Sequence, residues 1–201
     1  INEIKLKEEI APIIWVDFFD RENLTQSQTD EYVLYRPGIS HSVLIPAQIS
    51  VTLGHYFAIE KIANDPKIEI GMIIEDDIIF RNDFVSNLKK VLNCMPSDWD
   101  IFCIGGGNWL DGIDCSNTVN VQKYSDSISV YKPNDFGIVT GNYLINKRSA
   151  RQIMSHPLYK PFSFPIDWTL IKIARSFNMN VYWSRPFLSF EGSKKNCYEA
   201  S

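Results

Sequence analysis

Hydrophobic residues recur along this chain with two different periods, and the change from one to the other predicts a series of helices and strands. Residues 70–74 and 100–104 are short apolar runs with the length and composition of buried strands. Residues 46–64 place apolar side chains close to one helical face, between a proline suited to a first turn and the helix-stopping sequence Asn-Asp-Pro. A second amphipathic helix is expected after Asp83, ending before Pro96.

The segments nearer the two ends of the chain show weaker patterns. Residues 13–16 suit a short strand, whereas residues 20–45 form a long polar stretch that we expect to be a flexible or ligand-covering loop. Residues 119–146 alternate in part and predict a small β-rich insert. The remaining predicted elements are two helices and one strand, at residues 148–155, 167–177 and 181–183.

Apolar strands that alternate with helices are typical of an α/β sheet with helices on both faces. We expect one such domain over residues 1–201, because this length suffices for one well-buried core and hardly for two. Ligands of these sheets bind beyond the carboxyl ends of the strands. Two distinctive segments follow predicted strands at that end: the acids Glu75, Asp76 and Asp77, and the glycine-rich residues 105–109.

Net charge and aromatic content narrow the classes of ligand. The formal net charge is −4, so the chain lacks the basic surface with which proteins displace counterions from nucleic acids, and nucleic-acid binding is disfavoured. A small phosphorylated ligand remains compatible if a bound metal ion supplies positive charge locally. Aromatic residues make up 13% of the chain and include five tryptophans, which serve either the core or the stacking of sugars and bases.

The cysteines and the hydropathy pattern indicate the cellular compartment in which we expect the protein. Cys94, Cys103, Cys115 and Cys197 form no C-x-x-C pair, which argues against a zinc site. Cys94 and Cys103 lie in or beside apolar segments, which favours buried free thiols, although a disulfide between two of the four stays open. Without a signal peptide or an apolar run near membrane-spanning length, we expect a cytoplasmic protein, with peripheral membrane contact still open. The first residue is Ile, so the domain is either complete or one module of a longer chain.

Three consecutive carboxylates after a buried strand repel one another unless something positive satisfies them. A hard divalent cation such as Mn2+ or Mg2+ prefers oxygen ligands and can bridge a diphosphate at the same time. The residues Glu75, Asp76 and Asp77 therefore predict a metal site. The alternative is a solvated acidic strand end that caps the next helix.

The acidic cluster and three other blocks resemble the family 25 glycosyltransferases, which include lipopolysaccharide and procollagen sugar transferases. Residues 73–80 resemble the Glu-Asp-Asp block of that family. The other similar blocks occur in the same order, at residues 46–55, 99–105 and 141–150, the last followed by Pro-x-Asp at 165–167. The resemblance implies a GT-A-like, Rossmann-type mixed sheet, a nucleotide-sugar donor that is often UDP-linked, usually Mn2+, and transfer with inversion.

The chain departs from the pattern of that family at three places. The opening strand of the family, with Asn-Leu and following arginines that help to hold the nucleotide, has no counterpart here. Gly54 stands where Ser usually precedes the histidine, and Glu191 stands where Gln is common.

The resemblance assigns roles in the donor site and in the chemistry. Asp77 is the first choice for the metal ligand, and Asp76 and Glu75 would supply a second ligand and a contact to the ribose or nucleotide. His55 would reach the diphosphate or the acceptor, unless it is a structural residue in mid-helix. An inverting displacement needs a carboxylate base near the acceptor hydroxyl. Asp167 matches the motif for that base, and a helix N-cap is its alternative role.

The glycine-rich loop is the candidate for the acceptor side. Gly106 and Gly107 would allow a ligand to approach the backbone closely, Trp109 could stack on a sugar, and Asp111 would contact it. The loop lacks the Lys and Ser/Thr of a P-loop and the spacing of a dinucleotide fingerprint. A plain turn covered by the tryptophan is the alternative.

Together these features predict a metal-dependent glycosyltransferase that moves a sugar from a nucleotide-sugar donor to a hydroxyl of a glycan or protein acceptor. One alternative is a non-catalytic or truncated relative that binds a nucleotide or sugar. Another is a different metal-dependent phosphate enzyme, such as a nucleotidyltransferase, because clustered acids serve those enzymes as well.

Overall fold

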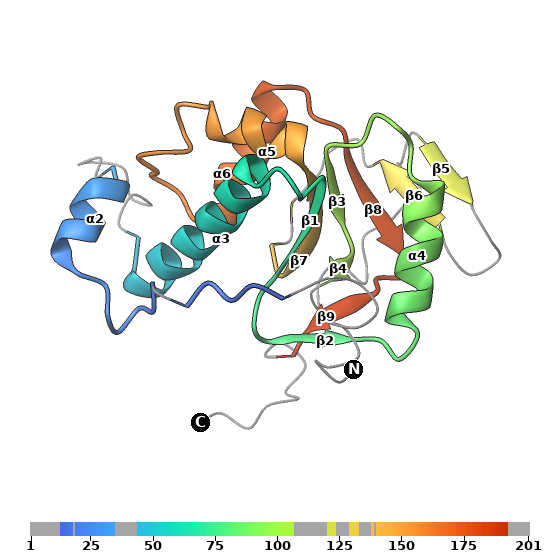
Figure 1. Cartoon of the computed structure of the whole chain (residues 1–201), viewed down its shortest axis with the longest axis horizontal. Helices are drawn as coiled ribbons and strands as arrows, with labels where there is room; N and C mark the ends of the chain where they lie inside the picture. Colours follow the sequence, from blue (N-terminus) through green and yellow to red (C-terminus); the bar gives the residue numbers. More distant parts are fainter. Residues whose placement is uncertain are drawn as a thin grey trace. The chain divides into compact units, whose positions relative to one another are not determined.

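The computed structural model describes residues 13–17, 19–34, 44–106, 120–123, 129–132, 138 and 140–192 (Figure 1). By the contacts within the chain, the residues divide into two compact units. The first unit comprises Ile1–Ile14, Met72–Ile145 and Asn180–Ser201, and the second comprises Trp15–Gly71 and Asn146–Met179.

Two sheets organise the strands. The larger has six strands in the order β1-β7-β3-β8-β6-β5, and the smaller has three in the order β2-β9-β4. Their bounds are β1 Ile70–Ile74, β2 Ile78–Phe80, β3 Ile101–Cys103, β4 Gly105–Gly106, β5 Asn120–Lys123, β6 Ser129–Lys132, β7 Asn142–Asn146, β8 Val181–Arg185 and β9 Ser189–Glu191.

The larger sheet is mixed, and four of its strands, β1, β3, β5 and β8, run in one direction. Strand β3 pairs antiparallel with β7 and parallel with β8. At the two ends of β1, Glu75 N–H donates to the Gly141 carbonyl and Lys147 N–H donates to the Glu69 carbonyl, both at 2.9 Å. These bonds make β1 antiparallel to β7. Strands β1, β3 and β8 are therefore parallel to one another, and their carboxyl ends point the same way.

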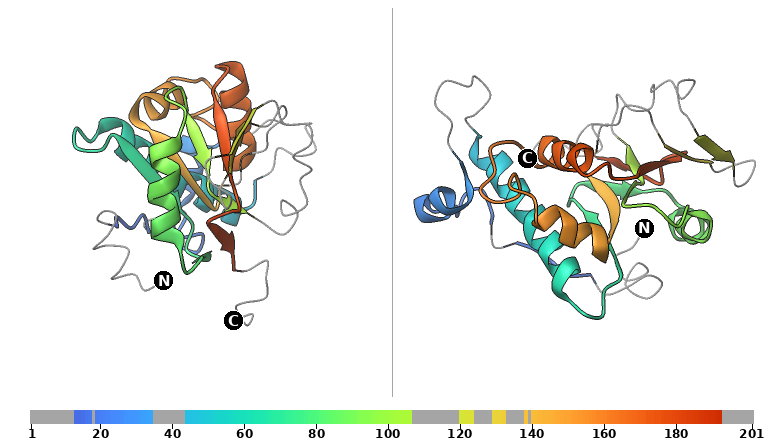
Figure 2. Two further views of the ribbon diagram at one scale, coloured as in Figure 1. Left: turned by 90° about the vertical axis from the view of Figure 1, so that its right-hand side faces the viewer. Right: turned by 90° about the horizontal axis from the view of Figure 1, so that it is seen from above.

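Helix α4 (Phe84–Cys94) packs on the larger sheet and forms the core of the first unit (Figure 2). Its Phe84 and Leu88 lie in one buried cluster with Phe102 of β3, Leu144 of β7 and Tyr182 of β8. The helix presents these side chains because apolar residues recur every three or four positions. Burying each such side chain contributes roughly 1.5–3 kcal/mol, so this face holds the helix to the sheet.

The second unit is mainly helical, with α2 (Gln26–Tyr32), α3 (Pro46–Asn64), α5 (Lys147–Met154) and α6 (Ile166–Ser176). Aromatic rings form part of its core. Tyr56 of α3 stacks on Tyr159 with ring centroids 4.2 Å apart and meets Phe162 edge-on at 5.1 Å. The Tyr159 hydroxyl also donates to the Tyr56 carbonyl at 2.8 Å, which satisfies a buried polar group.

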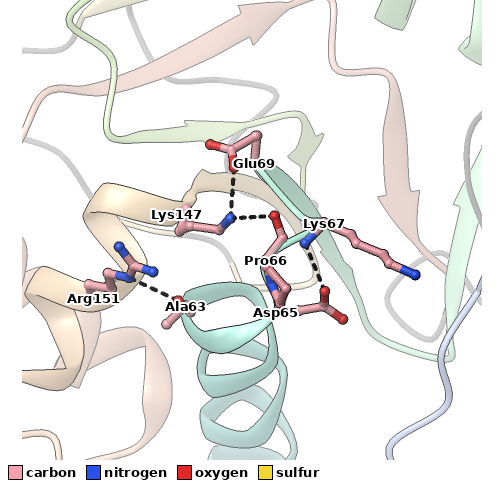
Figure 3. A network of polar contacts seen from close by, with 7 residues as sticks. All are labelled: Ala63, Asp65, Pro66, Lys67, Glu69, Lys147 and Arg151. Atoms are coloured by element: carbon pink, nitrogen blue, oxygen red, sulfur yellow. Dashed lines mark hydrogen bonds and ion pairs between the residues drawn. The ribbon is translucent and has the colours of Figure 1, made fainter.

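Two basic side chains of α5 bind the carboxyl end of α3 and the turn after it (Figure 3). Arg151 Nε donates to the Ala63 carbonyl at 2.9 Å. Lys147 Nζ contacts the Pro66 carbonyl at 3.3 Å and Glu69 Oε1 at 2.7 Å. The last carbonyls of a helix lack partners within it, so these contacts satisfy groups that α3 itself leaves open.

Most elements expected from the pattern are present, and the architecture is mixed α/β as predicted. The helix over residues 46–64 and the strand over residues 70–74 occur as α3 and β1. The expected strand at residues 13–16 is wrong, because these residues have no regular structure. The polar stretch at residues 20–45 is not a loop throughout, since it contains α2, which begins with a capping box formed by Thr25 and Gln28. The finer GT-A-like arrangement stays a prediction.

Candidate functional site

The first unit joins its two sheets at the carboxyl ends of three parallel strands. Strand β1 leads into β2 through Glu75, Asp76 and Asp77, β3 leads into β4 through Ile104, and β8 leads into β9 through residues 186–188 (Figure 1). The predicted acidic cluster is therefore the turn at which the chain passes from the larger sheet to the smaller one. This is the end of an α/β sheet at which ligands usually bind.

Backbone hydrogen bonds hold this acidic turn at both of its ends. The N–H of Glu75 donates to the carbonyl of Gly141 at 2.9 Å, and the N–H of Gly192 donates to the carbonyl of Asp77 at 2.8 Å. Asp76 between them is exposed, whereas Glu75 and Asp77 are half-buried. The turn thus has one exposed and two half-buried acidic residues, on a backbone anchored at residues adjacent to β7 and β9.

A fourth carboxylate, Glu191 of β9, lies next to the turn. It is opposite Ile78 in the β2–β9 pairing and is only 8% exposed. A Cβ placed on Gly141 would come within 3.2 Å of Glu191 Cγ and 3.3 Å of Oε1, so the acid side chain packs on this glycine. Since Gly141 also accepts the bond from Glu75, the negative charge of Glu191 is close to the start of the acidic turn.

In the sequence, Glu191 is distinguished only as a departure from the family pattern, without a predicted role. One signal was present in the sequence, because Glu191 follows an apolar run in the same manner as the acidic cluster follows β1. That signal was weak, since the run is short and irregular.

A buried polar pair lies behind the turn, and the sequence did not predict it. Asn142 Nδ2 donates to Ser189 Oγ at 2.9 Å, and both residues are fully buried. Gly105 of β4 packs against them, because a Cβ there would be 3.0 Å from Asn142 Cβ and 3.2 Å from Ser189 Oγ. Within the described part of the chain, the Asn142 Oδ1 atom is buried without a hydrogen-bond partner. Most buried acceptors in proteins have a partner, so this atom is an exception within the core of the first unit.

The pKa of Tyr143, the next residue of β7, is affected by the negative charge of the acidic turn. Burial raises the pKa of its hydroxyl well above the usual value, and the negative charge of Glu75 and the thiol of Cys103 raise it further. The tyrosine is therefore neutral at physiological pH and can act only as a neutral hydrogen-bonding group.

The side chains of the acidic turn could supply only part of the coordination of a metal ion. Among the residues that the structure describes, no three His, Cys, Asp or Glu side chains are grouped so as to hold a metal ion. Mg2+ and similar hard ions commonly take one or two carboxylates and complete their coordination with phosphate and water oxygens. Asp76 and Asp77 could supply such carboxylates.

The other predicted site residues lie elsewhere. Asp167 belongs to the second unit, in the first turn of α6, where Pro165 and not the aspartate occupies the N-cap position. His55 is buried within α3 of the same unit. Gly106 forms part of β4 in the first unit, where a Cβ would lie 2.2 Å from the ring of Phe187. The remaining acceptor candidates lie outside the described residues: Gly107, Trp109 and Asp111.

Comparison with known proteins connects the chain to one relative of described class. No protein-family model matches the chain. Over 132 residues it is 26% identical to the protein named "Putative glycosyltransferase R655" of Acanthamoeba polyphaga mimivirus. The similar region covers 65% of this chain and 40% of that relative, so the chain spans less than half of the length of the protein it matches. The sequence is thus glycosyltransferase-like.

A helix that spans a membrane must be both long and apolar. In the part of the chain that the structure describes, no helix is both long and apolar enough to cross a bilayer.

Proposed function

We propose that this chain transfers a sugar from a nucleotide-sugar donor to a hydroxyl group of an acceptor. One observation carries the proposal: three consecutive acids form an anchored turn at the carboxyl end of β1, in a chain similar to a protein named as a glycosyltransferase. An anchored turn can hold carboxylates in place before a ligand arrives, and such preorganisation favours the binding of one defined geometry.

The donor would bind at this turn together with a divalent cation. A nucleoside diphosphate is an anion, so Glu75, Asp76 and Asp77 repel it unless a positive ion lies between them. Mn2+ or Mg2+ bound by Asp77 and Asp76 would neutralise both sides and stabilise the departing diphosphate.

The acceptor hydroxyl would lose its proton to Asp167 in a single displacement that inverts the anomeric carbon. The lone pair of the acceptor oxygen forms the new glycosidic bond, the bond from the anomeric carbon to the diphosphate oxygen breaks, and the proton passes to the carboxylate. The structure contains two features suited to this role. Asp167 is only half-buried, and its Oδ1 accepts the N–H of Trp168 at 2.9 Å, which orients the carboxyl group.

Nucleotide binding tests the donor site directly. The protein is heated with UDP, GDP, CMP or ADP, each with and without Mn2+, and the midpoint of unfolding is recorded. At a ligand concentration about a hundredfold above its dissociation constant, binding adds about 2.7 kcal/mol to the free energy of unfolding. Each kcal/mol moves the midpoint by roughly 2–4 °C for a domain of this size, so the effect is readily measured.

Two charge-neutralising variants distinguish the effect of the acidic turn on nucleotide binding from the effect of the overall surface charge. Asp76→Asn removes an exposed carboxylate of the turn, and Glu22→Gln removes an exposed carboxylate of a different turn in the second unit. We expect one nucleotide to stabilise the protein only with Mn2+, and Asp76→Asn alone to weaken this effect. If no nucleotide shifts the midpoint with any metal, the proposed donor site is wrong. Binding without sugar transfer to any acceptor would instead identify a non-catalytic nucleotide-binding module.

A further inference from the structure

The start of α6 and the residues just before it carry a patch of one exposed and three half-buried side chains that the proposed chemistry does not use in full. Its four residues are Phe164, Asp167, Trp168 and Lys172, and we call them the α6 patch. The Trp168 side chain is 59% exposed, an unusual state for the largest apolar side chain. Lys172 lies one helical turn after Trp168, and its Nζ is 4.7 Å from the centre of the Phe164 ring.

Each member of the patch offers a different interaction to a ligand. The indole ring of Trp168 is an exposed apolar surface, and the apolar C–H face of a pyranose ring can stack on such a surface. The carboxylate of Asp167 accepts hydrogen bonds from hydroxyls, and the ammonium of Lys172 donates them. The backbone N–H of Trp168 donates to Asp167 Oδ1 at 2.9 Å, so the carboxylate is held at the backbone of the residue that carries the ring.

The charge and the size of the patch favour a neutral sugar over other ligands. One carboxylate and one ammonium cancel in formal charge, so the patch has no net attraction for a phosphate or an anionic lipid. A stable protein interface buries about 800 Å² on each partner, which one exposed tryptophan with its neighbours does not provide. A single hexose ring, in contrast, is small enough to stack on one indole face.

We propose that the α6 patch is a carbohydrate-binding subsite that holds a neutral hexose unit by stacking on Trp168. The assignment of this hexose to the acceptor rests on the proposed function, because only a sugar-transferring enzyme needs an acceptor beside its base. The subsite itself requires no nucleotide and no metal ion. It would place sugar hydroxyls next to Asp167.

Direct saccharide binding tests the subsite. Lactose, cellobiose and maltotriose are titrated into the nucleotide-free protein, and saturation-transfer NMR and tryptophan fluorescence report binding. Trp168→Ala removes the stacking surface, and Trp168→Phe retains an aromatic ring. Trp15→Ala is the matched control, since Trp15 is exposed to nearly the same extent, at 61%.

We expect at least one saccharide to bind the wild-type protein and Trp15→Ala equally well. Binding to Trp168→Ala should be about tenfold weaker, and Trp168→Phe should recover most of the loss. Unchanged binding to Trp168→Ala, an equal loss in both alanine variants, or no binding of any saccharide overturns the proposed subsite.

The nucleotide experiment separates this inference from the proposed function. Saccharide binding that depends on Trp168, without any nucleotide-dependent stabilisation, supports the subsite and contradicts sugar transfer. Nucleotide-dependent stabilisation without saccharide binding contradicts the subsite alone.

Discussion

The side chain of Asn142 donates a hydrogen bond to the hydroxyl oxygen of Ser189 at 2.9 Å and so links the larger sheet to the smaller one. Asn142 begins β7 and Ser189 begins β9, and both side chains are fully buried. Gly105 of β4 packs on the pair so closely that a Cβ there would lie 3.0–3.3 Å from its nearest neighbours. The acidic turn therefore connects two sheets that a buried polar contact also holds together.

A double-mutant cycle should show that this contact stabilises the first unit. Asn142→Ala removes the hydrogen bond from Asn142 Nδ2 to Ser189 Oγ, and we expect a loss of about 1–3 kcal/mol in the free energy of unfolding. Ser189→Ala in the same background should cost less than it does alone, because the pair is coupled. Urea unfolding measures all four proteins. Ser176→Ala on the surface of α6 is the control, and additive losses would contradict the coupling.

Two glycine substitutions should change stability in opposite directions. Gly106→Ala would place a Cβ 2.2 Å from the Phe187 ring, so the ring must move, and we expect a loss of about 1–3 kcal/mol. Gly54→Ala, within α3, has nothing within 4 Å of the new Cβ, so the better helix former should add about 1 kcal/mol. Thermal unfolding measures both variants. A neutral Gly106→Ala would show that the small sheet can relax around Phe187.

Stability should fall at alkaline pH because Tyr56 and Tyr143 are buried. Burial is the main cause that raises the pKa of each hydroxyl in the folded state above the usual value of 10.0. Below that pH both states keep these protons, and the full stability is present. Above it the unfolded state ionises first, so stability falls by about 1.4 kcal/mol per pH unit for each tyrosine.

The variant Tyr143→Phe tests this origin of the alkaline loss. Urea unfolding of the variant and of the wild type is measured at pH 8 and pH 11. The difference between the two pH values should be smaller in Tyr143→Phe, whatever the variant loses at pH 8. Equal differences in both proteins would show that Tyr143 makes no contribution.

The ion pair between Lys147 and Glu69 should be asymmetric in its contribution to stability. The Lys147 side chain is 11% exposed and Glu69 is 80% exposed, and the lysine also contacts the Pro66 carbonyl. Lys147→Met should therefore cost about 1–3 kcal/mol, since it removes charged hydrogen bonds from a largely buried position. Glu69→Gln should cost at most about 1 kcal/mol, as exposed ion pairs do. Urea unfolding compares the two, and equal losses would contradict the asymmetry.

Asp167→Asn should abolish sugar transfer and leave nucleotide binding intact. Loss of a positioned base typically lowers the rate by about 10²–10⁴-fold, whereas the amide keeps the size of the side chain. Product formation from the nucleotide sugar identified by the binding panel measures the rate, and the thermal shift measures binding. Glu22→Gln controls for the loss of one negative charge. Turnover retained in Asp167→Asn would exclude this residue as the base.

Local sequence patterns were sufficient to predict the elements whose conformation depends mainly on residues close in sequence. Helix α3 follows from apolar side chains at helical spacing between Pro46 and the stop at residues 64–66, and β1 follows from a continuous apolar run. The acidic turn was also evident, because consecutive carboxylates after a buried strand are unusual wherever they occur. The nature of its ligand remains a prediction.

Strands β4 and β9 were not predicted, since they are too short to show a period. Each has three residues or fewer, and their pairing brings Gly105 and Gly106 beside Ser189 and Phe190 from a distant part of the chain. Pairing of this kind depends on how the larger sheet directs its strand ends and not on local propensity. The same reason explains why residues 13–16, although apolar enough for a strand, form none.

The amino-acid sequence alone specified the periods of the main helices and strands, the acidic turn and the glycosyltransferase-like character of the chain. Folding in three dimensions was needed to place Glu191 against Gly141 and to bury Asn142 with Ser189. It was also needed to expose Trp168 on α6. A helical or strand period is a property of adjacent residues, whereas burial and side-chain contacts depend on segments far apart in sequence, which meet only when the whole core packs.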